Sequence, residues 1–384
     1  MKNKICVYAI TKNEEQFVEK WYDSMKEADA VVVLDTGSTD NTVAKLKELG
    51  AIVEVKEIKP WRFDVARNES LKLVPEDCNI LISTDLDEIL EPGWAQVLRD
   101  RWIEGKHERA IYKYTWSHLE DGSDGRVFRY DKIHTRKWKW RAPVHELLYN
   151  DETGSNLYNY DEILDLFDQV HLHHYPDQTK SRGSYLPLLE LRAKENPNDY
   201  YGLIYLAHEY YYRGKYGNSI KLLNKILTDY RDHYNSVEQA SCNLFIGDSF
   251  CALADDEDNK DMKSEFYQLA IESYKEAIKI DETYIEPYLN LGKVLLCIED
   301  YRSAEYYIKL GIKKSFRHYT WVERDTSWSY EPWDLLCLAT YYGGNKKDSI
   351  VYAAKALSFE PENIRLKNNL DLCIKGIDKL ELIK

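Results

Sequence analysis

Long apolar runs are missing from this sequence of 384 residues. No segment approaches the roughly 18 apolar residues in a row that would predict a membrane-spanning helix. The first residues, MKNKICVYAITKNEE, also lack the apolar core and the small-residue cleavage site of a secretory signal. We therefore expect a soluble, cytoplasmic protein.

A surplus of positive charge is missing too, because 52 Lys and Arg stand against 66 Asp and Glu, for a net charge of −14. This balance argues against a nucleic-acid-binding surface. The seven cysteines are dispersed and form no CxxC pair, which indicates reduced thiols and neither a disulfide framework nor a cysteine zinc site. The length predicts two or three domains.

The first half of the chain alternates apolar segments with amphipathic ones. Short β-branched and apolar runs predict buried strands, and segments of helical period lie between them. Such alternation is typical of a doubly wound α/β domain with parallel strands. The four predicted strands cover residues 4–10, 30–34, 51–58 and 79–83.

Three acids follow the last of these strands within four positions, in the segment STDLDE. Asp85 and Asp87 flank Leu86, so an extended backbone would project both carboxylates to one side. Two carboxylates at a strand end predict a divalent cation, Mn²⁺ or Mg²⁺, which prefers oxygen ligands and can carry a nucleotide diphosphate. A DxD alone is more often a solvated acidic turn.

Four motifs in order, ITKNEE, LDTGSTDNT, DVARN and STDLDE, make this DxD more specific, and together they span residues 10–88. They resemble those of family 2 glycosyltransferases of the GT-A fold. The resemblance implies a Rossmann-like mixed sheet in a catalytic domain at residues 1–195. It implies a metal-dependent hexosyltransferase that takes a nucleotide-sugar donor, such as a UDP- or GDP-sugar, and inverts the anomeric centre by direct displacement.

The same resemblance assigns roles residue by residue. Asp87 would be the direct metal ligand. Glu88 would be a second choice of catalytic base, or else an acid at a helix N-terminus. This chain has Thr36 where many members carry a second acid, which puts the contact with the nucleotide base in doubt. The nucleotide-sugar site would be lined by Thr11, Asn13, Glu14, Asp35, Arg67 and Asp85.

A predicted hairpin over residues 109–136 leads into a Trp-rich strand and the triplet VHE at 144–146. This triplet resembles the same glycosyltransferases. His145 would bind the cation or the diphosphate, and Glu146 would be the general base for the acceptor hydroxyl. The alternative is a structural strand whose His and Glu pair with neighbouring Arg side chains.

The segment QVHLHHY places His171 and His173 on one face of a predicted strand and His174 on the other. We expect His173 or His174 to complete the metal shell, with His173 assigned to it. A core histidine bound to a backbone group is the alternative. Zinc is set aside, because no cysteine or well-spaced carboxylate lies nearby in the sequence.

Residues 196–384 read as helices with a repeat of 34 residues. Ala270, Tyr274 and Ala277 precede Ala304, Ile308 and Gly311 by 34 positions each. This spacing resembles four TPR-like units with a capping helix at 363–384 and an acidic loop inserted at 255–264. We read 315–332 either as a loop packed on the repeats or as a lid over the acceptor.

The helical repeat leaves two further questions open. TPR arrays bind peptides or associate with themselves, so the acceptor is either a glycan or a peptide or protein, and a homodimer through this domain is one expectation. The whole chain could also be a peptide-binding scaffold with an inactive glycosyltransferase-like domain. A nucleotidyltransferase would show a Gly-rich basic loop near the first strand, and ITKNEE has none.

Overall fold

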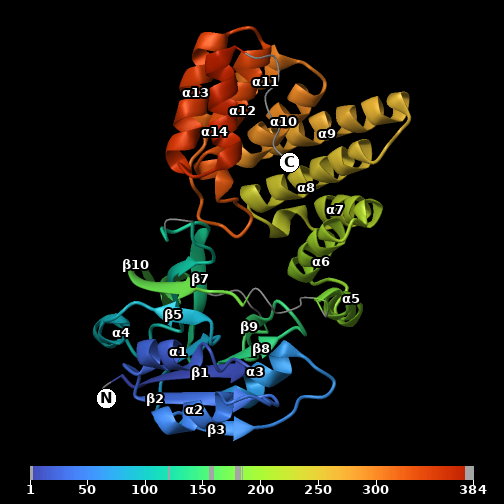
Figure 1. Ribbon diagram of the computed structural model, residues 1–384. Helices are drawn as coiled ribbons and strands as arrows, with labels where there is room; N and C mark the ends of the chain where they lie inside the picture. The colour runs from blue at the N-terminus through green and yellow to red at the C-terminus, as the bar shows by residue number, and fades with distance from the viewer. Residues whose placement is uncertain (1–2, 120–121, 155–159, 178–182, 184, 377–384) are drawn as a thin grey trace. The chain divides into compact units, whose positions relative to one another are not determined.

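The computed structural model describes residues 3–119, 122–154, 160–177, 183 and 185–376. By its internal contacts the chain divides into two compact units, Met1–Asn196 and Pro197–Lys384 (Figure 1). Within the described residues, no helix is both long enough and apolar enough to cross a membrane.

The first unit is built on a mixed sheet with the strand order β3-β2-β1-β4-β7-β6-β10-β5. The four strands β3, β2, β1 and β4 are parallel, and β7 runs antiparallel to both β4 and β6. At the far edge, β10 is parallel to β6 and antiparallel to β5. The strands are β1 (Ile5–Thr11), β2 (Ala30–Asp35), β3 (Ile52–Val55), β4 (Ile80–Thr84), β5 (Glu88–Leu90), β6 (Arg109–Thr115), β7 (Val127–His134) and β10 (Ile163–His174).

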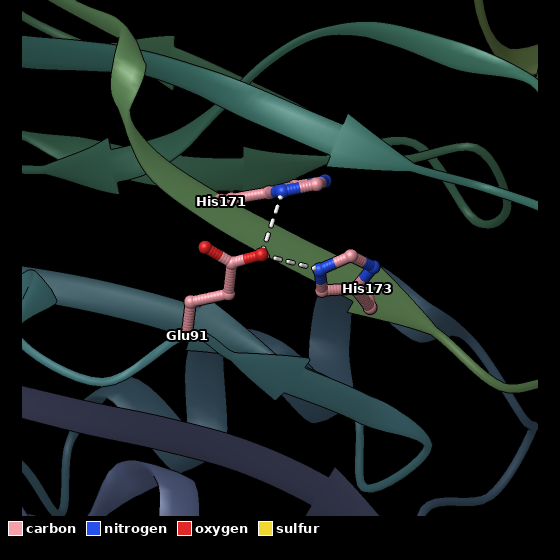
Figure 2. A group of neighbouring side chains, drawn as sticks. All are labelled: Glu91, His171 and His173. Carbon is pink, nitrogen blue, oxygen red and sulfur yellow. Dashed lines mark hydrogen bonds and ion pairs between the residues drawn. The ribbon is translucent and has the colours of Figure 1, made fainter. Parts of the chain in front are cut away.

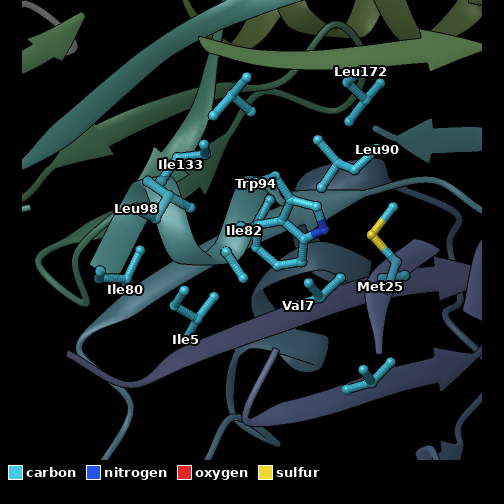
Figure 3. Close-up of a cluster of buried hydrophobic side chains, with 14 of the residues drawn as sticks. Ile5, Val7, Met25, Ile80, Ile82, Leu90, Trp94, Leu98, Ile133 and Leu172 are labelled. Atoms are coloured by element: carbon cyan, nitrogen blue, oxygen red, sulfur yellow. The ribbon is translucent and has the colours of Figure 1, made fainter. Parts of the chain in front are cut away.

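Side chains alternate between two apolar layers along β1, all of whose residues are buried. Ile5 and Val7 belong to a core with α1 (Val18–Met25), α2 (Thr42–Leu49) and α4 (Trp94–Arg101). Figure 3 shows this core, with Ile5, Val7, Met25, Ile80, Ile82, Leu90, Trp94, Leu98, Ile133 and Leu172 labelled.

The alternate residues of β1, Cys6 and Tyr8, pack on the other layer. That layer contains the end of α3 (Phe63–Leu71) and the hairpin of β8 (Trp138–Arg141) and β9 (Leu147–Asn150). The unit ends with α5 (Tyr185–Glu195), after the short 3₁₀ turn at Tyr160–Glu162. Helical layers on both faces confirm the predicted α/β class.

Two local expectations are wrong. The third strand is shorter than the predicted 51–58, because it ends at Val55 on the exposed edge of the sheet. Glu88 does not begin a helix. It begins the short strand β5, which pairs with the end of β10.

The second unit consists of helices that pack in consecutive pairs, followed by one more helix. The pairs are α6 (Tyr200–Tyr212) with α7 (Tyr216–Asp229), α8 (Ser236–Asp255) with α9 (Lys260–Ile280), α10 (Ile285–Cys297) with α11 (Tyr301–Lys314), and α12 (Glu331–Tyr342) with α13 (Lys346–Phe359). The last helix, α14 (Ile364–Lys375), packs on α13, and residues 377–384 of the predicted capping helix lie outside the described residues.

Glycines bring paired helices close together in this unit. A Cβ atom on Gly292 of α10 would lie 2.5 Å from Cγ1 of Ile308 on α11. Gly311 meets Tyr288 in the same way, at 2.6 Å from its Cβ. Gly311 belongs to the 34-residue pattern, and this close approach explains why that position of the pattern needs a small residue.

Two segments of the second unit refine the sequence expectations. The predicted loop at 255–264 is short, because Asn259 caps α9 by accepting hydrogen bonds from the amides of Asp261 and Met262. The segment 315–330 is largely irregular and packs on its own unit. Arg324 lies 2.7 Å from Asp248 of α8, and the Tyr284 hydroxyl donates to the carbonyl of Val322. These contacts favour the packed loop over the lid.

Candidate active site

The loops that follow β1 and β2 are joined by hydrogen bonds at the carboxyl edge of the sheet. Asn13 adopts a positive φ of 55° after β1, and its side-chain oxygen accepts a 2.7 Å hydrogen bond from the Thr39 amide. Its own amide donates to the Ser38 hydroxyl at 2.8 Å. Thr11 donates to Glu14 at 2.8 Å, and both are buried. These predicted nucleotide-site residues therefore shape the loop around the end of β1.

Asp35 lies at the end of β2, fully buried. Its Oδ1 accepts hydrogen bonds of 2.9 Å from the amides of Gly37 and Ser38, and the Ser38 hydroxyl donates to Oδ2. Gly37 has a φ of 111°, which few other residues adopt. The carboxylate thus holds the turn that the motif DTGS encodes.

Arg67, a predicted site residue on α3, forms ion pairs with two acids of the site. Nη2 of Arg67 lies 2.9 and 3.1 Å from the two carboxylate oxygens of Asp85, and its Nε forms an ion pair with Glu146. Burial disfavours the charge of Arg67, but the two carboxylates outweigh it and raise the pKa of Arg67 further. In this structure the guanidinium of Arg67 thus contacts two carboxylates of the site.

A second cation, Lys132 of β7, lies 3.7 Å from Asp85 and is itself buried. Burial raises the pKa of Asp85, but Arg67 and Lys132 lower it more, to about 2. The same two cations overcome the effect of burial on Glu146 and lower its pKa. The site therefore holds two ionised carboxylates and two cations below the end of β4.

Glu88 has both carboxylate oxygens occupied. Its Oε2 accepts a hydrogen bond of 2.9 Å from the Asp85 amide, and its Oε1 accepts one of 2.9 Å from the Tyr114 hydroxyl. Burial raises the pKa of Glu88, although Lys132 opposes this. Glu88 therefore organises the turn between β4 and β5.

Residues 86–87 form a turn, so the backbone between Asp85 and Asp87 is not the extended strand that was expected to project both carboxylates to one side. Asp87 instead meets His174, whose Nε2 lies 3.4 Å from its Oδ2. The His174 ring stacks on Trp116 at 4.5 Å, and its Nδ1 lies 3.0 Å from the Trp116 carbonyl oxygen. Burial lowers the pKa of His174, but Asp87 outweighs it, and the pKa is raised.

His173, the assigned metal ligand, points to the opposite face of β10 and lies in a separate cluster. Its Nε2 lies 3.0 Å from Oε1 of Glu91, and Nδ1 of His171 lies 3.0 Å from the same oxygen (Figure 2). Strand alternation separates His173 from His174, so the structure brings His174 to Asp87 and leaves His173 out. Two further side chains lie near the other ring nitrogen of His173: Nε2 of His118 lies 3.1 Å from its Nδ1, and Oδ1 of Asp124 lies 3.8 Å from it.

His145 adopts a positive φ of 48° between β8 and β9. Its ring contacts Tyr185 of α5 edge-on at 5.7 Å, and its carbonyl oxygen accepts a 2.7 Å hydrogen bond from Arg192. These contacts join His145 to α5. The neighbouring Glu146 reaches the site through Arg67, as described above.

The residues that surround the predicted ones could not be identified from the sequence. Lys132 and Tyr114 lie in strands of the hairpin, and Trp116 follows one of them. A charged residue at a buried position of a predicted strand was the available signal for Lys132. Glu91 and Asp124 gave no signal, because they meet the histidines only through the sheet pairing.

In the first unit, acids thus follow the ends of the parallel strands β2 and β4. The other part of the sheet places His174, at the end of β10, beside one of these acids, Asp87. This mixed sheet has the α/β architecture expected of the predicted GT-A domain, and the second unit has the paired helices expected of TPR-like repeats.

The matches to known families agree with this division. Residues 6–162 match the family described as Glycosyl transferase family 2, and residues 261–296 match the family described as TPR repeat. The first unit therefore contains a family 2 glycosyltransferase domain, and the second contains a TPR repeat.

Relatives in Rickettsia are similar to part of the chain. An uncharacterized glycosyltransferase of Rickettsia bellii is 33% identical over 111 residues, which cover 27% of this chain and 37% of that protein. Another, of Rickettsia typhi, is 48% identical over 108 residues, which cover 26% of this chain and 36% of that protein. The chain thus spans little more than a third of these relatives.

Two solved structures are also similar to parts of the chain. A thermophilic TPR protein of Thermus thermophilus matches with 18% identity and a TM-score of 0.39, covering 50% of this chain and 89% of that one. The glucosyl-3-phosphoglycerate synthase of Mycobacterium tuberculosis, in complex with Mn²⁺, UDP and glucosyl-3-phosphoglycerate, matches with 25% identity and a TM-score of 0.26. That match covers 29% of this chain and 44% of the synthase.

Proposed function

We propose that the protein transfers a hexosyl group from a nucleotide-diphosphate sugar to an acceptor hydroxyl or peptide side chain, with Mn²⁺ or Mg²⁺ as cofactor. The observation that carries the proposal is the approach of Asp87 and His174 at 3.4 Å, beside Asp85 and its two buried cationic partners, Arg67 and Lys132. This arrangement lies in a domain of the glycosyltransferase family 2.

The residues present fit a divalent cation. A carboxylate oxygen of Asp87 and a ring nitrogen of His174 face each other, and the other ring nitrogen is held by the Trp116 carbonyl. Such a second contact fixes the ring and directs Nε2 toward the carboxylate. Asp87 and His174 would hold the ion, whose chemistry when bound is to neutralise the diphosphate as it leaves.

The two buried cationic side chains, Arg67 and Lys132, support the same proposal. Arg67 and Lys132 keep Asp85 ionised and hold it in place, so it can accept hydrogen bonds from the donor's ribose or from water. The loops of Asn13 and Asp35 line the neighbouring strand ends, where α/β sheets bind nucleotides. We propose that these loops contact the nucleoside.

Glu146 is the better of the two predicted bases. A general base must be ionised before it accepts a proton, and Arg67 and Lys132 lower the pKa of Glu146 and so favour its ionised form. Both oxygens of Glu88 are also engaged within the protein. We propose that Glu146 accepts the acceptor proton and that the reaction inverts the anomeric centre, with the TPR-like unit as the binding site of a glycan or peptide acceptor.

A donor screen by isothermal calorimetry tests the proposal. UDP-, GDP- and dTDP-sugars are titrated in Mn²⁺ and in EDTA into the parent chain, Asp87→Ala and the control Asp77→Ala, whose exposed carboxylate pairs with Lys4. We expect one donor to bind in Mn²⁺ only, and Asp87→Ala alone to lose it. If a folded parent chain binds none of the donors, the scaffold alternative is favoured instead.

A further inference from the structure

A second group of metal-type ligands lies on the opposite face of β10 from His174. His171 and His173 are two residues apart on this strand and share a face, and Glu91 reaches the same face from the end of β5. The backbone fixes this meeting, because the Glu91 amide donates a 3.0 Å hydrogen bond to the His171 carbonyl. None of the three takes part in the donor site proposed above.

The three ligand atoms already converge. Oε1 of Glu91 lies 3.0 Å from Nδ1 of His171 and 3.0 Å from Nε2 of His173, and all three atoms lie within 4.8 Å of one another (Figure 2). Two imidazoles and one carboxylate suit zinc and related ions and leave a coordination position open. We propose that Glu91, His171 and His173 bind a divalent transition-metal ion of the zinc type, separate from the cation of Asp87 and His174.

The opposite ring nitrogens are held as they are in metal sites. Nε2 of His171 lies 2.7 Å from the Thr115 hydroxyl, and Nδ1 of His173 lies 3.1 Å from Nε2 of His118. Oδ1 of Asp124 lies 3.8 Å from both of these nitrogens and accepts a 2.9 Å hydrogen bond from Thr115. Outer contacts of this kind orient the rings that bind a metal.

The local charge also suits an incoming cation. Lys113, a positive group that acts on His171, is neutralised by Asp124 at 2.6 Å. Glu91 therefore remains as the anionic ligand, and its side chain is 57% exposed while those of His171 and His173 are 13% and 17% exposed. The ion would enter from solvent on the Glu91 side and settle on two ordered rings.

Binding here would join two strands that carry the donor site. Glu91 follows β5, the short edge strand that begins at Glu88, and His173 immediately precedes His174. An ion bound to both strands would fasten this edge and so restrain the positions of Asp87 and His174. We therefore expect the ion to raise the melting temperature of the full chain.

The test uses the full chain with Asp87→Asn, which weakens the first cation site, and titrates it with Zn²⁺ alone and with Co²⁺ as a spectroscopic probe. We expect one Zn²⁺ per chain and Co²⁺ absorption bands of imidazole coordination. Glu91→Gln and His171→Ala should each weaken binding about tenfold or more, and Asp124→Asn about 10- to 100-fold. His233→Ala removes an exposed histidine of the second unit and should change nothing.

Three outcomes would overturn the assignment. One is a Zn²⁺ stoichiometry below one in the folded Asp87→Asn chain. Another is unchanged Zn²⁺ affinity in both Glu91→Gln and His171→Ala. The third is loss of binding in His118→Ala with full binding in Glu91→Gln, which would move the ion to His118, Asp124 and Nδ1 of His173. Glu91→Gln is the safer variant for folding, since that side chain is exposed.

Discussion

Asp87 and His174 face each other across the junction of β5 and β10, with Oδ2 and Nε2 3.4 Å apart. The backbone sets this meeting, because the Tyr175 amide donates a 2.7 Å hydrogen bond to the Asp87 carbonyl and Glu88 pairs with His174 in the sheet. The strand β5 follows the DxD turn and runs antiparallel to β10, which carries His174. This pairing places the carboxylate of Asp87 beside the imidazole of His174. The adjacent His173 faces the other way.

His174→Ala and His173→Ala should therefore behave differently. The first removes a ring that faces Asp87, and we expect the affinity for the donor in Mn²⁺ to fall about tenfold or more, as for the loss of a metal ligand or its support. The second should leave this affinity within about twofold. Calorimetric titration of the donor identified in the screen measures both. Equal losses in the two variants would contradict the separation of the two faces.

Asp85→Asn should make the stability of the protein less dependent on acid. Burial opposes ionisation of Asp85, but Arg67 and Lys132 lower its pKa to about 2, below the value of about 3.9 in an unfolded chain. The ionised form therefore stabilises the fold above about pH 4, and this contribution is lost as the pH falls through about 2. Melting temperatures of parent and variant should differ by several degrees at pH 7 and converge only as the pH falls below about 2.

Asp77→Asn is the matched control for this measurement. Asp77 pairs with Lys4 at the surface, where both side chains are about half exposed or more, and such pairs contribute little. Its melting temperature should stay close to that of the parent at every pH. A loss at pH 7 as large as that of Asp85→Asn would show that the buried network has no special role.

Gly292→Ala should destabilise the second unit. The added Cβ would lie 2.5 Å from Ile308, and forcing extra volume into a packed helix pair costs roughly 1–3 kcal/mol. Gly217→Ala on α7 is the control, because nothing lies within 4 Å of its added Cβ and alanine favours a helix. Urea unfolding followed by circular dichroism should show a loss for the first and no loss for the second.

Much of the architecture could be predicted from the sequence, because periodicity reports burial directly. The apolar run 4–10 became the central strand β1, and the 34-residue spacing of Tyr274 and Ile308 marks two buried helix faces. The loop at 255–264 was overestimated, since its charged residues suit an exposed helix as well as a loop. Asn259 decides between them by capping the helix at that point.

The partners of the site residues could not be predicted, since they depend on how distant strands pair. Which histidine reaches Asp87 follows from the register of β10 with β5, and no local pattern encodes that register. The sequence argues against zinc because no cysteine or well-spaced carboxylate lies near the histidines in it. The fold supplies Glu91 from 80 positions earlier, a spacing that no short motif records.

The last prediction concerns the two acids proposed as base. Glu146→Gln removes the proton acceptor but keeps the shape of the side chain, so we expect kcat to fall about 10²- to 10⁴-fold, the usual worth of general base catalysis, with the donor affinity nearly unchanged. Glu88→Gln removes the buried carboxylate that accepts from Tyr114 and the Asp85 amide. It should lower the melting temperature and reduce kcat less than Glu146→Gln does.

The variant Arg67→Lys distinguishes between two roles for Glu146: catalytic base, or a residue that only positions Arg67. Lysine keeps the charge but cannot contact both Asp85 and Glu146 as the guanidinium does. If Glu146 serves only to hold Arg67, then Arg67→Lys and Glu146→Gln should show equal losses of kcat, and the double variant should lose no more than either. If Glu146 is the base, its variant alone should abolish the acidic limb of the pH profile of kcat, because that limb reports its ionisation.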